Sequence, residues 1–204
     1  MKAKILETAA EMFLSYGFKS ITMDDIAQKM GISKKTIYSH FQNKKVLVTE
    51  RTLSVFYEIK KGVEAIRNEQ HNPILELYEI KKFINKHLKD EKSAPQYQLN
   101  KYYPMAHKKL VEKQFEVMEE CISTNLKKGI AQDLYRKEID IAFVTRIYFK
   151  GVMGIKDIET FAPEDFTMSS LLENFIDYHI RGIATKKGVE TLERTKTAQT
   201  KTVL

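Results

Sequence analysis

Apolar residues recur along most of the chain at the three- and four-residue spacing of amphipathic helices. Near the amino end, one face of a predicted helix that ends at Gly17 carries Ile5, Ala9, Met12, Phe13 and Tyr16. No alternating strand pattern of useful length is present, so the pattern predicts an all-α fold of about nine helices. Beyond the amino-terminal region, helices are expected at about 43–67, 73–89, 93–103, 105–128, 140–156 and 167–186.

Residues 22–41 predict two short helices joined by a tight turn. Thr22 and Asp25 have the spacing of a capping box, which satisfies amide donors at the start of the first helix. Gly31 suits the end of that helix because glycine tolerates a positive φ, and Ser33 is a good N-cap for the second. A short helix braced in this way by another helix suits the DNA major groove.

Lysines stand in the first turn of two predicted helices, at Lys34 and at Lys44. A cation there opposes the helix dipole, so a partner outside the chain is expected to offset the cost, and phosphate suits that role. Residues 28–45 contain five lysines and no acid. Residues 52–185 hold twenty charges of each sign and are neutral, whereas the whole chain has a formal net charge of +7. This distribution favours a localised polyanion site over an ordinary solvated basic face.

Residues 3–50 resemble the DNA-binding head of the tetracycline-repressor (TetR) family, over about a quarter of the chain. The matching landmarks are Ile5, Ala9, Phe13, Gly17, Phe18, Thr22, Ile26, Ala27, Gly31, Ser33, Thr36, Tyr38, Phe41, Lys44 and Leu47. The resemblance implies a three-helix head with a helix-turn-helix at residues 1–48. It also implies a helical body at 49–204 that binds a ligand and forms the dimer.

The same resemblance implies which side chains contact double-stranded DNA. Phosphate contacts are expected from Thr22, Tyr38 and Lys44, and also from His40. Groove contacts are expected next to the N-cap Ser33, from Lys34, Lys35 and Thr36. Lys35 stands where the family often has a small residue, and Lys45 where an acid is common. Both departures add positive charge, and they leave open which base sequence is recognised.

The two helices predicted before the tail, the first capped by Asp140 and the second starting at Thr167, are apolar over wide arcs. A wide arc buries two sides, so these helices are the predicted interface of a homodimer. The alternative is that both lie in the core of one large monomer. A twofold dimer matches a palindromic operator. The predicted interface residues are Ile147, Gly151, Ile155, Leu172, Phe175 and His179.

Aromatic and methionine side chains in the body are candidates for a small-molecule pocket, although plain core packing is the alternative for most of them. Residues 97–105 are aromatic with few charges and are broken by Pro104, so they are a candidate lid. The expected ligand is a small apolar or aromatic effector. The candidate pocket residues are Tyr78, Tyr97, Tyr102, Tyr103, His107, Phe115, Met118 and Phe149.

The chain offers little support for catalysis, and no cofactor or metal is expected. Adjacent acids point to different faces of a helix, and the histidines show no metal spacing. The single cysteine, Cys121, cannot form an internal disulfide, and a core position suits it better than a nucleophilic role. Charged residues interrupt every apolar run near the amino end, so we expect no membrane segment and a cytoplasmic protein. The Thr/Lys-rich tail after Glu193 is expected to fray.

Together these features predict a homodimeric DNA-binding transcription regulator, most simply a repressor whose effector shifts the population of DNA-competent dimers. One alternative is a DNA-bound interaction protein that has no effector and recruits another protein. A helical enzyme is a further alternative, and its activity would survive the loss of Lys44 and Tyr38.

Overall fold

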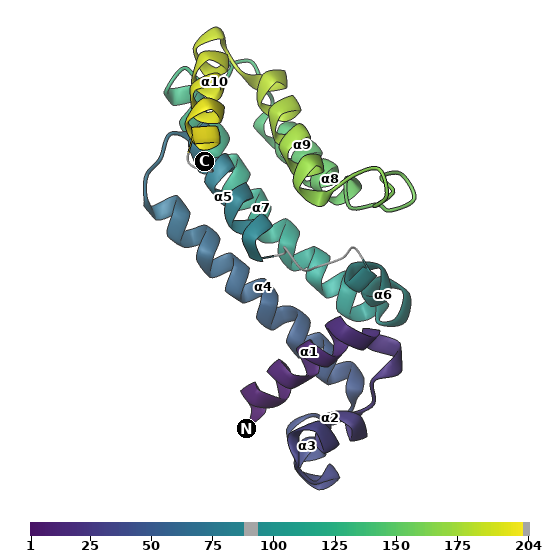
Figure 1. Ribbon diagram of the computed structural model, residues 1–204. Coiled ribbons are helices and arrows are strands. Elements are labelled where there is room, and N and C mark those ends of the chain that lie inside the picture. Colours follow the sequence, from purple (N-terminus) through teal and green to yellow (C-terminus); the bar gives the residue numbers. More distant parts are fainter. Residues whose placement is uncertain (88–93, 202–204) are drawn as a thin grey trace. The chain divides into compact units, whose positions relative to one another are not determined.

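The computed structural model describes residues 1–87 and 94–201, and within these ranges every regular element is an α-helix (Figure 1). The predicted all-α class is therefore confirmed. The described ranges hold ten helices rather than about nine, and the added one is α10. The helices are α1 (Lys2–Ser20), α2 (Met23–Met30), α3 (Lys34–His40), α4 (Lys44–Asn68), α5 (Pro73–His87), α6 (Ala94–Tyr102), α7 (Pro104–Ala131), α8 (Ile141–Gly154), α9 (Met168–Ile183) and α10 (Lys186–Lys201).

The chain forms two compact units, which we call the head unit and the body unit. The head unit combines residues 1–58 with 90–114, and the body unit combines residues 59–89 with 115–204. Helices α4 and α7 each contribute residues to both units. The head unit thus includes α6 and the start of α7, which a boundary at residue 48 assigns to the body.

The core of the head unit confirms most of the inward positions expected from the apolar pattern, but Tyr16 is 67% exposed. Helix α1 is interrupted at Gly17, which has φ +80°, where the predicted helix ends. Helix α2 packs against α1 and α3. Each fully buried aliphatic or aromatic side chain contributes about 1.5–3 kcal/mol to folding. The buried apolar side chains here include Ile5, Ala9, Phe13, Ile26, Ala27, Ile37, Phe41, Leu47 and Val48.

The core of the body unit joins α5, α7, α8, α9 and α10 around a buried polar network. Asn125 donates its amide hydrogens to the Pro73 carbonyl, at 2.9 Å, and to the Glu76 carboxylate, at 2.8 Å. The Tyr135 hydroxyl donates to the Asn125 carbonyl oxygen at 3.2 Å. These bonds satisfy polar groups that would otherwise be costly to bury. The surrounding apolar core includes Ile74, Leu77, Ile122, Leu126, Tyr148, Ile176, Ile180, Ile183 and Leu192.

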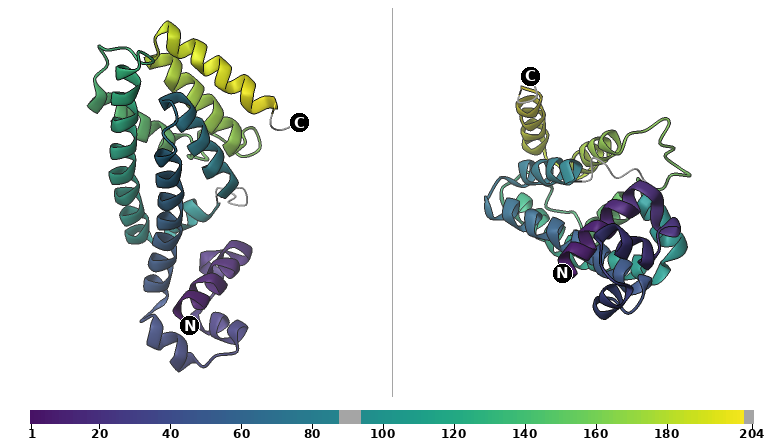
Figure 2. Two further views of the ribbon diagram at one scale, coloured as in Figure 1. Left: turned by 90° about the vertical axis from the view of Figure 1, so that its left-hand side faces the viewer. Right: turned by 60° about the horizontal axis from the view of Figure 1, so that its bottom comes forward.

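Helix α10 corrects the expectation that the chain frays after Glu193, and α9 correspondingly ends at Ile183, before the predicted 186. Leu192 of α10 is fully buried, so an apolar contact made just before the polar tail holds the whole helix. Helix α10 packs against α5 and α9, and the left view of Figure 2 shows it beside α9. Thr195 and Thr197 donate their hydroxyls to carbonyls four residues earlier, which shields the polar stretch.

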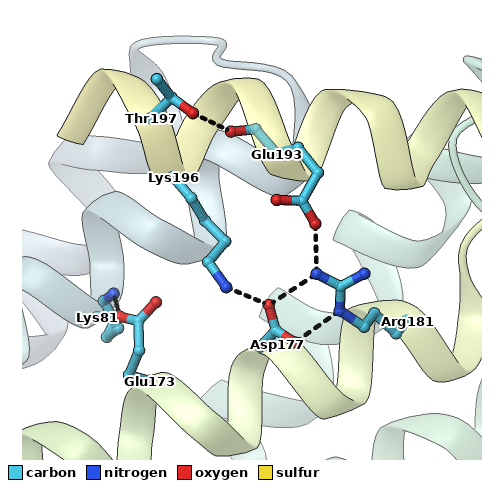
Figure 3. Close-up of polar contacts among 7 residues, drawn as sticks. All are labelled: Lys81, Glu173, Asp177, Arg181, Glu193, Lys196 and Thr197. Carbon is cyan, nitrogen blue, oxygen red and sulfur yellow. Dashed lines mark hydrogen bonds and ion pairs between the residues drawn. The ribbon is translucent and has the colours of Figure 1, made fainter. Parts of the chain in front are cut away.

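Ion pairs also hold α10 on α9 (Figure 3). The Asp177 carboxylate forms ion pairs with Lys196 of α10, at 2.6 Å, and with Arg181 of its own helix, at 2.7 Å. Arg181 in turn pairs with Glu193 of α10. Hydrogen bonds from Arg181 and Lys196 lower the pKa of Asp177 against the opposing effect of its partial burial. A polar sequence thus becomes an ordered helix through charges matched across two elements.

Removing the buried contact of α10 should destabilise the body unit. We expect Leu192→Ala to lower the free energy of unfolding by about 2–5 kcal/mol, because it deletes buried methyl groups and leaves a cavity. Arg194→Ala, on the exposed side of the same helix, should change it by about 0.5 kcal/mol or less. Urea denaturation of both variants measures the difference. Equal stability of the two variants would contradict the docking of α10.

Candidate nucleic-acid interface

The motif helices α2 and α3 are set in place by the predicted caps. The Thr22 hydroxyl accepts the Asp25 amide at 3.1 Å, and the Asp25 carboxylate accepts the Thr22 amide at 2.7 Å. The Thr22 hydroxyl also donates to this carboxylate at 2.7 Å, and the hydrogen bonds from the amide and hydroxyl of Thr22 lower the pKa of the Asp25 carboxyl. Gly31 ends α2 with φ +64°, and no atom lies near the position of a missing side chain. Backbone conformation, and not crowding, therefore requires glycine there.

Helix α3 has one buried face and one exposed face. Ser33 caps it by accepting the Thr36 amide at 3.0 Å. Ile37 and Phe41 are fully buried, as predicted from their spacing of four. The opposite face is left for contacts outside the chain.

The structure brings the eight predicted DNA-binding residues together on the head unit, between Thr22 and Lys44. Thr22 and Ser33 are exposed but serve as helix caps. Lys34, Lys35 and Tyr38 are exposed on α3, whereas Thr36, His40 and Lys44 are half-buried. Tyr38 keeps 47% of its surface accessible although it is aromatic. Lys29, Ser39 and Lys45, which the predicted set leaves out, are also exposed.

Lys34 has a partner inside the chain, contrary to the expectation that the cations at these helix starts lack one. Its ammonium lies 2.5 Å from the Asp24 carboxylate in the first turn of α2. The hydrogen bond to Asp24 raises the pKa of Lys34. Both side chains are exposed, so water and salt screen the pair and a phosphate group can compete for the ammonium.

Lys44 also has an internal partner, and this one is a backbone group. Its ammonium donates a hydrogen bond to the Phe18 carbonyl and lies 5.8 Å from the centre of the Phe13 ring. Burial lowers the pKa of Lys44. The Phe18 amide donates to the side-chain oxygen of Gln98 in α6 at 2.9 Å. Side chains from α4 and α6 therefore bind the two polar groups of one residue at the end of α1.

Sequence reasoning missed these partners for different reasons. The pair with Asp24 could have been predicted, because this acid and Lys34 stand in the first turns of two short helices that a tight turn joins. The Phe18 carbonyl and Gln98 carry no such signal, because a backbone acceptor and a distant amide come together only in the tertiary fold.

The candidate pocket residues separate into two groups. Those of the head unit include Tyr103, which packs against Phe18 with ring centres 5.9 Å apart, and the neighbouring His107, whose pKa burial lowers. Those of the body unit include Phe115 and Phe149, in an edge-to-face pair 5.0 Å apart. The head group is Tyr97, Tyr102, Tyr103 and His107, and the body group is Tyr78, Phe115, Met118 and Phe149.

The predicted dimer-interface residues also differ in their surroundings. Ile155, Leu172 and His179 are buried within the chain, and burial lowers the pKa of His179 to about 4. A side chain at Gly151 would lie 2.2 Å from the Phe175 ring, so the close approach expected there is made to the chain's own α9. Ile147 is 50% exposed.

Among the residues that the structure describes, no group of three or more histidine, cysteine or acidic side chains is placed to hold a metal ion. The same residues include no helix with the length and apolar character that a membrane crossing requires.

Comparisons with known proteins agree with this geometry. A family model described as bacterial regulatory proteins, tetR family, matches residues 5–50. IcaR of Staphylococcus aureus, a negative transcriptional regulator of the biofilm operon icaADBC, is 30% identical over 80 residues, which are 39% of this chain and 43% of IcaR. The chain therefore matches less than half the length of this curated relative.

Solved structures resemble the fold over a longer range. A transcriptional regulator from Cytophaga hutchinsonii aligns with a TM-score of 0.74 at 18% identity, over 90% of this chain and 98% of its own. The repressor FadR of Thermus thermophilus, solved with lauroyl-CoA, aligns with a TM-score of 0.62 at 16% identity, over 91% and 96%. Residues 5–50 therefore match the DNA-binding region of the tetR family of bacterial regulatory proteins, and the longer chain shares its fold with solved transcriptional regulators.

Proposed function

We propose that this protein is a sequence-specific DNA-binding transcription regulator and that α3 enters the major groove. The observation that carries the proposal is the division of α3 into a fully buried face and an exposed cationic face. Its seven residues rise about 10 Å, a length that suits contact from within a groove about 12 Å wide. Lys35 and Tyr38 on the exposed face are free to reach base edges and phosphates.

The proposed phosphate contacts use helix starts together with the internally bound lysines. Lys34 and Lys35 stand in the first turn of α3 and Lys44 in that of α4, and helix-start amides together with lysine side chains favour an anion. Lys44 would exchange the Phe18 carbonyl for a phosphate oxygen, replacing a neutral acceptor with a charged one. The lowered pKa of Lys44 supports this exchange, because burial already disfavours its charge without an anion.

We propose that two copies assemble through α8 and α9 and bind a palindromic operator. The apolar side chains that the chain leaves exposed on these helices include Phe143, Ile147 and Tyr178, at 60%, 50% and 79% accessibility. Helices α8 and α9 pack against each other, and exposed apolar side chains on neighbouring helices are typical of an interaction surface. A second copy is the simplest occupant, since twofold symmetry matches half-sites about one DNA turn apart.

Repression is the proposed outcome of DNA binding, in the cytoplasm where a bacterial chromosome lies. The similarity to IcaR, a negative regulator, supports it. A small-molecule effector is also proposed, because FadR was solved with lauroyl-CoA bound. The effector would change DNA affinity by preferring one of two dimer states. The protein is proposed to act by binding and not as an enzyme.

Salt dependence tests the phosphate role of Lys44. We expect Lys44→Ala to weaken binding to every duplex and to lower the slope of log affinity against log salt by about one unit. Lys127→Ala, at an exposed position on α7 of the body unit, should leave that slope unchanged. Thermal unfolding confirms that each variant is folded. If folded Lys44→Ala kept the wild-type salt slope, Lys44 of the wild-type protein would not contact phosphate and would remain bound to the Phe18 carbonyl in the DNA complex.

Selection of bound fragments from random duplex DNA tests base recognition by α3. The protein should select a palindrome with half-sites about one turn apart. We expect Lys35→Ala to change the preferred bases at one position of each half-site, because its side chain is exposed on the face of α3 proposed to reach base edges. Identical selected sequences for both proteins would remove Lys35 from base recognition, and an absence of selected sequences would reject the proposed function.

Sedimentation velocity tests the assembly surface. We expect Ile147→Asp to shift the protein from dimer to monomer, because a buried unpaired carboxylate in an interface is strongly unfavourable. Met105→Asp, at a 76% exposed apolar residue of the head unit, is the matched control and should stay dimeric. A wild-type monomer that co-purifies with a different protein would instead favour the alternative of a recruiting interaction protein.

A further inference from the structure

A hollow of about 230 Å³ opens on the head unit between the end of α1 and α6. Its walls include Gly17 and Lys19 of α1 and Tyr97, Gln98 and Tyr102 of α6. The α3 face and the exposed apolar side chains of α8 and α9 contribute none of its lining. The proposed DNA and dimer contacts therefore leave its chemistry unexplained.

The floor of the hollow has a fixed geometry. The Gln98 side-chain oxygen accepts the Phe18 amide at 2.9 Å, which holds α6 against the end of α1. Gly17 has φ +80°, and a side chain there would start 2.9 Å from the same oxygen. Glycine is thus required both by its backbone conformation and by the space that Gln98 occupies. Because this contact is made within one unit, the hollow is preformed.

Two lysines lie close to the aromatic rings of the hollow: Lys19 lines it, and Lys101 precedes the lining residue Tyr102. Lys101 lies 5.5 Å from the Tyr97 ring centre and 5.7 Å from that of Tyr102, and Lys19 lies 5.9 Å from Tyr102 on the side of α1. Tyr97 and Tyr102 are 47% and 37% exposed, so their rings are only partly covered. The described lining residues include no carboxylate.

We propose that this hollow binds a small aromatic anion, meaning a molecule of one or two rings with a carboxylate or similar group. Its rings would stack on Tyr97 and Tyr102, and its charge would pair with Lys19 and Lys101. The volume lies below the usual range of drug-sized pockets, about 300–1,000 Å³, which limits the ligand to this size. The inference rests on the proposed function in one respect, because it names the chemical class of the effector.

Binding here would affect DNA affinity through Phe18. Gln98 in the wall holds the Phe18 amide, and the carbonyl of the same residue holds the Lys44 ammonium. A ligand that moves Gln98 therefore acts on a residue that positions a proposed phosphate contact. By linkage, the factor by which the ligand changes DNA affinity must equal the factor by which DNA changes ligand affinity.

Isothermal titration of the full-length chain with 2-naphthoate tests the site. We expect saturable binding of one molecule per chain, weakened about tenfold in the Lys19→Gln/Lys101→Gln double variant, since each exposed ion pair with the ligand carboxylate contributes up to roughly five-fold. Tyr102→Ala should weaken it by a similar factor. Lys109→Gln, at an exposed position elsewhere in the head unit, should leave the affinity unchanged. Neutral 2-naphthamide and the non-aromatic cyclohexanecarboxylate should bind at least tenfold more weakly.

The proposal is overturned if 2-naphthoate fails to bind, or if it binds equally well to the double variant and to Tyr102→Ala in their folded state. Equal affinity for 2-naphthamide would overturn the anionic class. Binding of 2-naphthoate with no change in affinity for the selected duplex would overturn the effector role. These results are distinguishable from failure of the proposed function, because duplex binding without ligand is measured separately.

Discussion

Complete burial of one face of the helix-turn-helix is the constraint on which the rest of the head depends. Ile26, Ile37 and Phe41 lose all contact with water, and they can do so only when α2 and α3 keep one relative orientation. The Thr22 and Ser33 caps then only have to end the helices cleanly, since the core already determines their direction. Burial of the apolar face of α3 leaves its polar and cationic side chains on the opposite face, which is exposed to a partner. The surface proposed to contact DNA is thus a consequence of packing.

The lysines at the helix starts show how far an electrostatic argument from sequence can go. The helix dipole disfavours cations there, and the sequence therefore predicted a compensating partner outside the chain, whereas the structure gives both lysines a partner inside it. The sequence does not show which groups each lysine side chain can contact in the folded chain. Lys34 finds Asp24 on the preceding helix, and Lys44 folds back to a carbonyl of α1. Both partners lie inside the chain, so the proposed DNA complex requires an exchange of partners and not the simple filling of an empty charge. An exposed ion pair and a single hydrogen bond to a neutral carbonyl are both weak enough for such an exchange.

Local signals predicted most of the helix ends. The capping box at Thr22, the glycine turn at Gly31 and the cap at Asp140 each act over four residues, and each appears in the structure as expected. The end of the chain was different. Helix α10 depends on Leu192, which fills a space formed by helices far away in sequence, and on charges of α9 that pair with Glu193 and Lys196. Composition alone therefore indicated fraying. The hollow beside Gly17 was missed for the same reason, because Gln98 meets α1 only through the tertiary fold.

The wide apolar arcs of α8 and α9 illustrate a further limit of periodicity. A helix pattern shows how many sides are buried but not which neighbour covers each side. Ile155, Leu172 and His179 lie in the chain's own core, and Gly151 makes room for Phe175 of the same chain. The core of the same chain thus covers much of the apolar arc that the sequence pattern assigned to a second subunit. Phe143, Ile147 and Tyr178 are what it leaves uncovered. Any twofold assembly through these helices must use that smaller set, because residues buried in the core of their own chain have no accessible surface for contact with a partner.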